Sequence, residues 1–259
     1  MRIDKPIAES TRDNLTIEVY ADRAAAGRAA AAIVGERIRR AVADRGEANV
    51  VFAAAPSQND FIESLLEDEA LPWDKINCFH LDEYHTLPVG APQRFDSYLQ
   101  EHLWGKVKAR NVYLLVPRDG MTEEEIEERY ARLLREYPLD VACIGIGENG
   151  HVAFNDPPVA DFNDKRIIKE VELDEMCRNQ QVHDGSFDSL EDVPKTAITM
   201  TIPAVMKAAS VCAIVPTDRK AEAVANTVKG PIDEVCPASI LRRHQDAVLI
   251  LDKAAASRI

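Results

Sequence analysis

Short apolar runs recur along the chain at intervals. Each run is apolar at successive positions, which is typical of strands that are covered on both faces of a sheet. The runs lie at residues 49–55, 76–81, 111–115, 139–147, 196–202, 210–216 and 246–251, and LTIEVY at 15–20 predicts one further strand.

Helical signals fill the stretches between these runs. Residues 21–44 are rich in alanine and carry larger apolar residues at helical spacing. Ser57, followed by Asp60, predicts a capped helix start, and 122–125 has the pattern of a capping box. The stretch 217–230 opens with capping residues and ends at glycine. Because strands alternate with helices, we predict an α/β fold with a mostly parallel sheet and right-handed crossovers.

The chain shows no internal repeat and no linker, so residues 1–259 are expected to form a single domain. The least regular part is 156–195, which is rich in Asp, Asn and Pro. A long irregular segment in a compact domain is either a functional lid or a solvated excursion. We expect a lid at about 156–195, with the solvated excursion as the alternative.

Composition narrows the function classes. The 259 residues are 46% hydrophobic and 29% charged, as in a soluble globular protein, and the net charge is −13. An acidic chain repels nucleic acid, although a local cluster of donors can still bind a small anion. We expect no membrane association, because no apolar run approaches about 20 residues. The five cysteines lack any C-x-x-C spacing, which favours buried thiols in a reducing cytoplasm.

Gly145, Gly147 and Gly150 have the G-x-G-x-x-G spacing of a dinucleotide-binding turn. Such a turn needs a helix that opens inside it, because the helix N-terminus holds the pyrophosphate. Here Pro157 and Pro158 follow closely, and the residues between lack a helical apolar period. We therefore expect a glycine-bent loop without a nucleotide site.

The same loop carries acid–base groups. Glu148, Asn149, His151, Asn155 and Asp156 follow a strand at its carboxyl end, where open α/β sheets place their ligands. An imidazole beside a carboxylate can move protons near neutral pH. A plain polar turn is the alternative.

A second polar group follows the strand at 76–81. Asp82, Glu83, Tyr84 and His85 come directly after it and are expected at the same edge of the sheet. Two carboxylates suit acid–base work, and they suit a metal ion as well, although the spacing matches no metal motif. Taken alone, these residues also fit a solvated turn. Two acid–histidine loops on one sheet edge favour a shared site.

These stretches resemble a known family. LDEY at 81–84 and GIGENGHVAFNDPP at 145–158 are similar to motifs of the glucosamine-6-phosphate deaminase/isomerase family, and 193–215 and 218–232 resemble two further family segments in the same order. The resemblance implies a Rossmann-like three-layer sandwich with a mostly parallel central sheet and no nucleotide site. It implies conversion of glucosamine 6-phosphate and water to fructose 6-phosphate and ammonia, without a metal or cofactor.

The resemblance also implies roles for individual residues. Asp82 matches the base that moves a proton between C2 and C1 of the sugar. His151 matches the group that helps to open the pyranose ring, and Asn149 and Asp156 match the residues that orient and tune it. Lys220 falls where a lysine contacts the substrate phosphate.

The chain departs from the family pattern in three places. The glycine-rich phosphate loop is replaced by AAAPSQND at 53–60, where Ser57, Gln58 and Asn59 still offer side-chain donors. The family glutamate and aspartate beside the histidine are Asp156 and Asn149. The segment 177–187 lacks the usual lid sequence, and Arg178 is the candidate for an arginine that reaches the phosphate.

Three alternatives to this function stay open. The first is the same chemistry on another phosphosugar, such as galactosamine 6-phosphate. The second is a hydrolase similar to 6-phosphogluconolactonase, against which FNDP at 154–157 and the DEY motif argue. The third is a sugar-phosphate sensor without turnover, against which retention of Asp82 and His151 argues. The expected partner is a small phosphorylated sugar. Family members range from monomers to hexamers, so a homo-oligomer is compatible with the resemblance.

Overall fold

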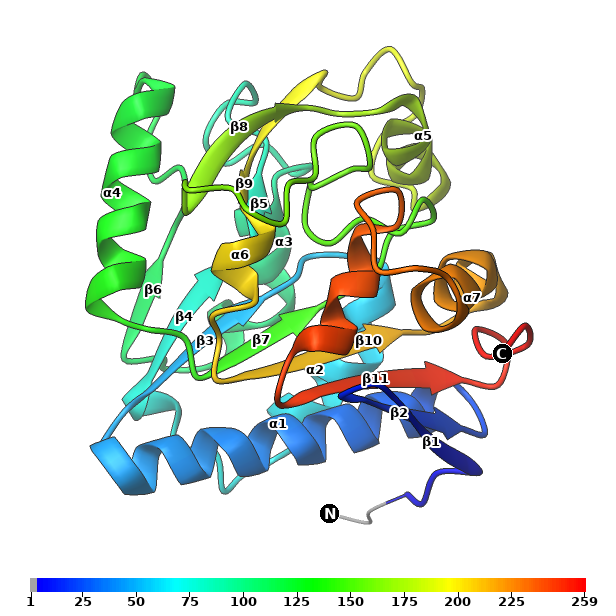
Figure 1. The fold of residues 1–259 in the computed structure, drawn as a ribbon. Helices are drawn as coiled ribbons and strands as arrows, with labels where there is room; N and C mark the ends of the chain where they lie inside the picture. The colour runs from blue at the N-terminus through cyan, green and yellow to red at the C-terminus, as the bar shows by residue number, and fades with distance from the viewer. Residues whose placement is uncertain (1–3) are drawn as a thin grey trace.

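The computed structural model describes residues 4–259, whose main feature is a twisted eight-stranded sheet (Figure 1). All neighbouring strands are parallel except the edge pair formed by the first two strands. The mostly parallel α/β fold is therefore confirmed. In spatial order the strands are β1 (Ala8–Arg12), β2 (Leu15–Tyr20), β11 (Ala247–Asp252), β10 (Ser210–Val215), β7 (Val141–Ile144), β3 (Ala48–Phe52), β4 (Ile76–His80) and β6 (Asn111–Tyr113).

Helices cover both faces of this sheet, because its central strands are apolar on both sides. In β3, Val51 packs into one hydrophobic cluster, and Val50 and Phe52 pack into the other. One face carries α1 (Arg23–Arg45), α2 (Asn59–Leu66) and α3 (Phe95–His102). The other carries α4 (Glu123–Glu136), α6 (Ile202–Val205), α7 (Ala221–Lys229) and the 3₁₀ helix η5 (Pro237–Arg243).

Of two predicted helix starts, one is confirmed and the other is wrong. The capping box of Thr122 and Glu125 is present at the start of α4. The predicted Ser57 cap of α2 is wrong. Pro56 opens a short 3₁₀ turn, η1 (Pro56–Gln58), and α2 begins only at Asn59, without a side-chain cap. Ser57 is therefore inside the 3₁₀ turn, and its hydroxyl is free for another role.

A second, three-stranded antiparallel sheet lies above the carboxyl ends of the main strands (Figure 1). It consists of β5 (Asp82–Glu83), β9 (Thr196–Met200) and β8 (Ile168–Glu172). The strand expected at 196–202 thus exists, but it belongs to this sheet and not to the parallel one. The segment 156–195 is more regular than expected, since it contains β8 and the helix α5 (Glu175–His183).

A third hydrophobic cluster joins the small sheet to α5. Its centre is Tyr84, whose ring lies 5.1 Å from that of Phe95, 5.4 Å from that of Phe154 and 5.6 Å from that of Phe187. These rings come from four separate segments. Their packing fixes the loops after β4 and β7 against the segment that carries α5.

The order of the strands creates a crevice at the middle of the sheet. From β3 the chain proceeds to β4 on one side, whereas from β7 it proceeds to β10 on the other side. The loops that leave β3 and β7 therefore diverge at their carboxyl ends. Open α/β sheets bind ligands at such a switch point. No helix in 4–259 has the length and apolar character needed to cross a membrane.

Candidate active site

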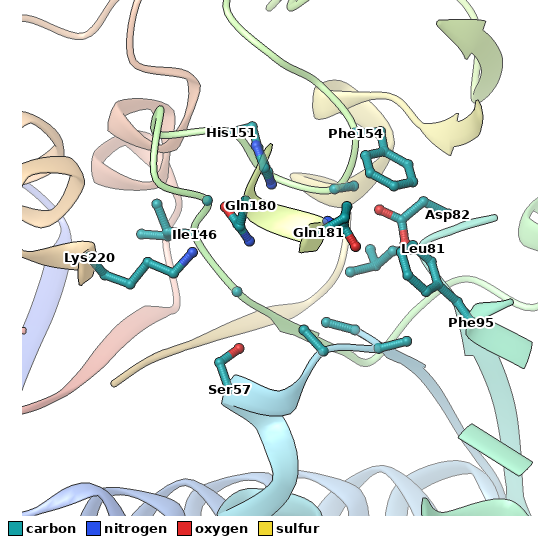
Figure 2. Close-up of a pocket in the computed structure, with 16 residues that line it drawn as sticks. Ser57, Leu81, Asp82, Phe95, Ile146, His151, Phe154, Gln180, Gln181 and Lys220 are labelled. Atoms are coloured by element: carbon teal, nitrogen blue, oxygen red, sulfur yellow. The ribbon is translucent and has the colours of Figure 1, made fainter. Parts of the chain in front are cut away.

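A pocket opens at this switch point (Figure 2). Its empty volume is about 500 Å³, which includes space that is open to solvent. Loops after β3, β4 and β7 form its floor and walls, and α5 and the short 3₁₀ helix η4 (Asp218–Lys220) complete it. Its polar lining side chains are Ser57, Asp82, His151, Gln180, Gln181 and Lys220.

Asp82 stands at one end of the pocket. Strand β5 holds its backbone opposite Thr199 in β9, and the residue is only 7% exposed. Burial raises the pKa of the Asp82 carboxyl well above its ordinary value, and the nearby carboxylates of Glu83 and Asp156 raise it further. A carboxyl group with a raised pKa can both accept and return a proton near neutral pH.

Glu83, the next residue, faces away from this chemistry. Its carboxylate accepts hydrogen bonds from the backbone N–H groups of Phe95 (3.0 Å) and Asp96 (2.9 Å) at the start of α3. Burial raises the pKa of Glu83 to about 7, although the nearby Arg94 guanidinium, 3.6 Å away, lowers it. Glu83 thus fastens the helix N-terminus to the loop that carries Asp82.

His85 also turns away from the pocket. Its Nε2 atom lies 3.1 Å from a carboxylate oxygen of Glu170 on β8 and 3.6 Å from one of Glu123 on α4. Of the two acids and the histidine after β4, only Asp82 lines the pocket in the described chain. The second acid–histidine loop therefore contributes one group to the shared site.

His151 and Asp156 form the second acid–base unit. The Nδ1 atom of His151 lies 2.9 Å from Oδ1 of Asp156, although the contact does not have the geometry of a hydrogen bond. Gly147 makes room for the ring, because a Cβ atom at that position would lie 2.2–2.3 Å from the imidazole atoms. Gly147 of the G-x-G-x-x-G motif thus leaves space for the ring of His151.

Hydrogen bonds hold Asp156 in its ionised form. Asn149 Nδ2 donates to Oδ1 of Asp156 at 2.9 Å, and the backbone N–H of Asp174 donates to Oδ2 at 3.2 Å. Burial alone would raise the pKa of Asp156, but the contact with His151 and these two hydrogen bonds outweigh it and lower the pKa. A lasting negative charge beside His151 stabilises an imidazolium.

Lys220 and Ser57 make the opposite end of the pocket polar (Figure 2). Lys220 is 7% exposed, and its Nζ atom is buried with no hydrogen-bond partner within residues 4–259. Burial lowers its pKa, although the carboxylates of Asp184 and Glu148 act against this. An unpaired buried amine that lines a pocket is a ready partner for an anion.

Residues 21–250 match the profile of the family described as glucosamine-6-phosphate isomerases/6-phosphogluconolactonase. The chain belongs to this family. A glucosamine-6-phosphate deaminase from Exiguobacterium sibiricum is 38% identical over 189 residues, which span 71% of this chain and 73% of that protein.

Two solved structures share this fold. One is described as a monomeric glucosamine-6-phosphate deaminase; it has a TM-score of 0.85 and 26% identity, and the match covers 94% of this chain and 99% of that one. The other is a 6-phosphogluconolactonase from Shewanella baltica, with a TM-score of 0.73 and 15% identity over 95% of this chain and 99% of that one. The second comparison shows the shared fold only.

In this member of the glucosamine-6-phosphate isomerase/6-phosphogluconolactonase family, the loop after β3, residues 53–60, contains no glycine. Ser57 lines the pocket, whereas Gln58 Nε2 donates to the carbonyl oxygen of Ile214 at 3.1 Å, and Asn59 accepts a hydrogen bond from the hydroxyl of Tyr98. Gln58 and Asn59 therefore fasten the start of α2 to β10 and α3. They do not line the pocket.

Asp60 is turned away from the pocket as well, because it forms an ion pair with Arg23 on α1. Its charge is thereby compensated by the guanidinium of Arg23. Arg178 lies on α5 but donates to the carbonyl oxygens of Leu190 (2.5 Å) and Val193 (3.0 Å). The structure thus places Arg178 in the packing of the following loop, outside the pocket lining.

Three residues at the site escaped sequence reasoning. Gln180 and Gln181 on α5 line the pocket, and Asp174 caps α5 by accepting a hydrogen bond from the backbone N–H of Cys177 at 2.6 Å. An aspartate directly before a helix, here Asp174 before Glu175, is a recognisable cap signal. The pair of glutamines carries no signal, since exposed glutamines are common on helices.

Proposed function

We propose that this protein converts glucosamine 6-phosphate and water to fructose 6-phosphate and ammonia. The observation that carries the proposal is that Asp82, with its raised pKa, and His151, which contacts the buried Asp156, line one pocket. The curated relative at 38% identity, which is a glucosamine-6-phosphate deaminase, supports the choice of substrate.

His151 is the group for ring opening. The pyranose opens when the proton of the C1 hydroxyl leaves and the ring oxygen gains one. The imidazole of His151 can carry this proton, and the carboxylate of Asp156 stabilises the imidazolium formed in between. Asn149 fixes the loop, because its Oδ1 accepts the backbone N–H of His151 at 3.0 Å.

Asp82 is the group for isomerisation. In the open chain it removes the proton from C2 and delivers a proton to C1, which moves the double bond to the nitrogen-bearing carbon. Water then adds at C2, and the C–N bond breaks to release ammonia and leave the ketose. One carboxyl group that alternates between its two forms serves both proton transfers, and its raised pKa suits this task.

Lys220 and Ser57 bind the phosphate in this proposal. They lie at the end of the pocket away from Asp82, so that the phosphate and the reacting carbons would occupy opposite ends (Figure 2). The buried amine of Lys220 supplies the charge, and the Ser57 hydroxyl supplies a donor. The substrate is a small phosphosugar. We infer that the segment 156–195, which contains α5, acts as a lid over it.

The setting of the reaction is also part of the proposal. We place the protein in the cytoplasm, in the breakdown of amino sugars such as N-acetylglucosamine. Its five cysteines are all free thiols, and four of them are buried, as suits a reducing compartment.

The decisive experiment measures ammonia released from glucosamine 6-phosphate together with fructose 6-phosphate formed. Equal amounts of both products are expected, and Asp82→Asn should bind the substrate without turnover. A folded protein that releases no ammonia contradicts the proposal. In that case galactosamine 6-phosphate, hydrolysis of 6-phosphogluconolactone and simple binding of phosphosugars distinguish the three alternatives.

A further inference from the structure

Gln181 is a buried polar side chain whose amide makes no hydrogen bond to the protein within residues 4–259. It lies on α5, is 7% exposed and lines the pocket. In the view of Figure 2 its amide lies on the Asp82 side of the pocket, away from Lys220 and Ser57. The amide oxygen and nitrogen of Gln181 are open to the pocket and have no protein partner in the described part of the chain, so they are available to a group of the ligand.

The neighbouring Gln180 differs in this respect, although it is just as buried at 6% exposure. Its Oε1 accepts the backbone N–H of Glu148 at 2.9 Å, and its Nε2 lies 3.4 Å from Oδ2 of Asp184. Gln180 is thereby bound to the loop that carries His151. The two glutamines share helix, burial and pocket, but only the amide of Gln181 remains available to a substrate.

We propose that Gln181 is a specificity-determining residue that hydrogen-bonds the C3 hydroxyl of the sugar. The inference rests on the proposed function, which puts C1 and C2 at Asp82 and the phosphate at Lys220. A group on the Asp82 side then meets the carbon next to the reacting pair. C3 is that carbon, and its hydroxyl can both donate to and accept from an amide.

The amide has a clear energetic consequence. A bound substrate that excludes water from the pocket but lacks the hydroxyl leaves the Gln181 amide unpaired, which costs more than a typical hydrogen bond contributes. A sugar that lacks the C3 hydroxyl, or presents it in the opposite configuration, is therefore rejected. The glutamine supplies hydroxyl recognition from α5, which lies in the segment 156–195.

The test is a double-mutant cycle in which the Gln181 side chain and one substrate hydroxyl are removed singly and together. The wild-type protein and Gln181→Leu are each assayed for ammonia release from glucosamine 6-phosphate and from its 3-deoxy and 4-deoxy analogues. For the wild type, removal of the C3 hydroxyl is expected to lower kcat/KM about 10- to 100-fold. In Gln181→Leu the same removal should change kcat/KM less than about threefold, since the partner is already gone.

The controls separate recognition from mere damage. The effects of the 4-deoxy substitution and of Gln181→Leu should multiply. Gln180→Leu, which disturbs the His151 loop, should lower turnover by a similar factor for the parent sugar and both analogues. A structural role for Gln181 predicts multiplication with the 3-deoxy analogue as well, and that result overturns the inference.

Two further outcomes are distinguishable. Coupling with the 4-deoxy analogue in place of the 3-deoxy one overturns the assignment to C3. A wild-type protein that releases no ammonia from glucosamine 6-phosphate overturns the proposed function, and with it this inference. An active wild-type enzyme whose Gln181→Leu effects multiply throughout overturns the inference alone.

Discussion

Asn149 Nδ2 donates a hydrogen bond to Oδ2 of Asp174 at a distance of 2.9 Å. The bond joins the loop after β7 to the residue that caps α5. The same nitrogen also donates to Asp156, so one amide holds two carboxylates apart and in place. The position of α5 over the pocket is therefore tied to the group that stabilises His151.

This relationship predicts that Asn149→Asp is harmful. The variant would lose both donated hydrogen bonds and place a third carboxylate beside Asp156 and Asp174. We expect a loss of about 1–3 kcal/mol in unfolding free energy and at least about a tenfold loss in kcat. Thermal unfolding and steady-state kinetics measure these. Asn226→Asp, an equal charge change on the exposed face of α7, is the control. Unchanged activity in Asn149→Asp would contradict the tether.

Adjacent acids in the DEY motif should respond oppositely to neutralisation. Asp82→Asn removes an unfavourable buried charge, so we expect a higher melting temperature together with about a 10²- to 10⁴-fold loss of kcat. Glu83→Gln loses an acceptor for the N–H groups of Phe95 and Asp96, so we expect a lower melting temperature.

The pH dependence of stability follows from the same shift. The pKa of Asp82 is raised in the folded state, so the folded protein holds this proton more tightly than the unfolded chain does. Ionisation of Asp82 therefore costs stability as pH rises above the unfolded value near 4. Melting curves of wild type and Asp82→Asn should converge at low pH and separate as pH rises. A constant difference would contradict the assignment.

Gly147→Ala tests the space reserved for His151. The added methyl group would meet the imidazole atoms at 2.2–2.3 Å, so the ring must leave its place beside Asp156. We expect about a hundredfold loss of kcat with a folded protein. Gly145→Ala is the matched control for stability, since its new methyl group finds Gln58 Nε2 at 3.4 Å. Melting temperatures that fall equally in both variants would argue against a specific clash.

Because of Lys220, the KM for the phosphosugar should rise at alkaline pH. Burial lowers the pKa of its amine, so the charge is lost at a lower pH than in an ordinary lysine. KM for the phosphosugar is expected to rise as pH increases through this lowered pKa. Lys220→Met should raise KM at neutral pH and remove the alkaline rise, whereas Lys253→Met, on the exposed surface, should do neither. An alkaline rise that persists in Lys220→Met would assign it to another group.

The strands and helices were readable because their signals are local. An apolar run such as 210–216, or an alanine-rich segment with helical periodicity such as 21–44, predicts a buried element from local sequence alone. The sheet to which 196–202 belongs was not readable. Its pattern is that of a buried strand in either sheet, and only its pairing with Asp82 and with β8 decides the matter.

For the site as well, some features could be predicted from the sequence and others could not. By itself, the sequence determined that Asp82, Asn149, His151 and Asp156 follow strands at their carboxyl ends, and parallel strands bring those ends to one edge. Only the tertiary structure decided which side chains turn inward. Ser57 and Gln181 face the pocket while Asn59 and Arg178 bond elsewhere, because side-chain direction depends on partners distant in the sequence, such as Tyr98 for Asn59 and Val193 for Arg178.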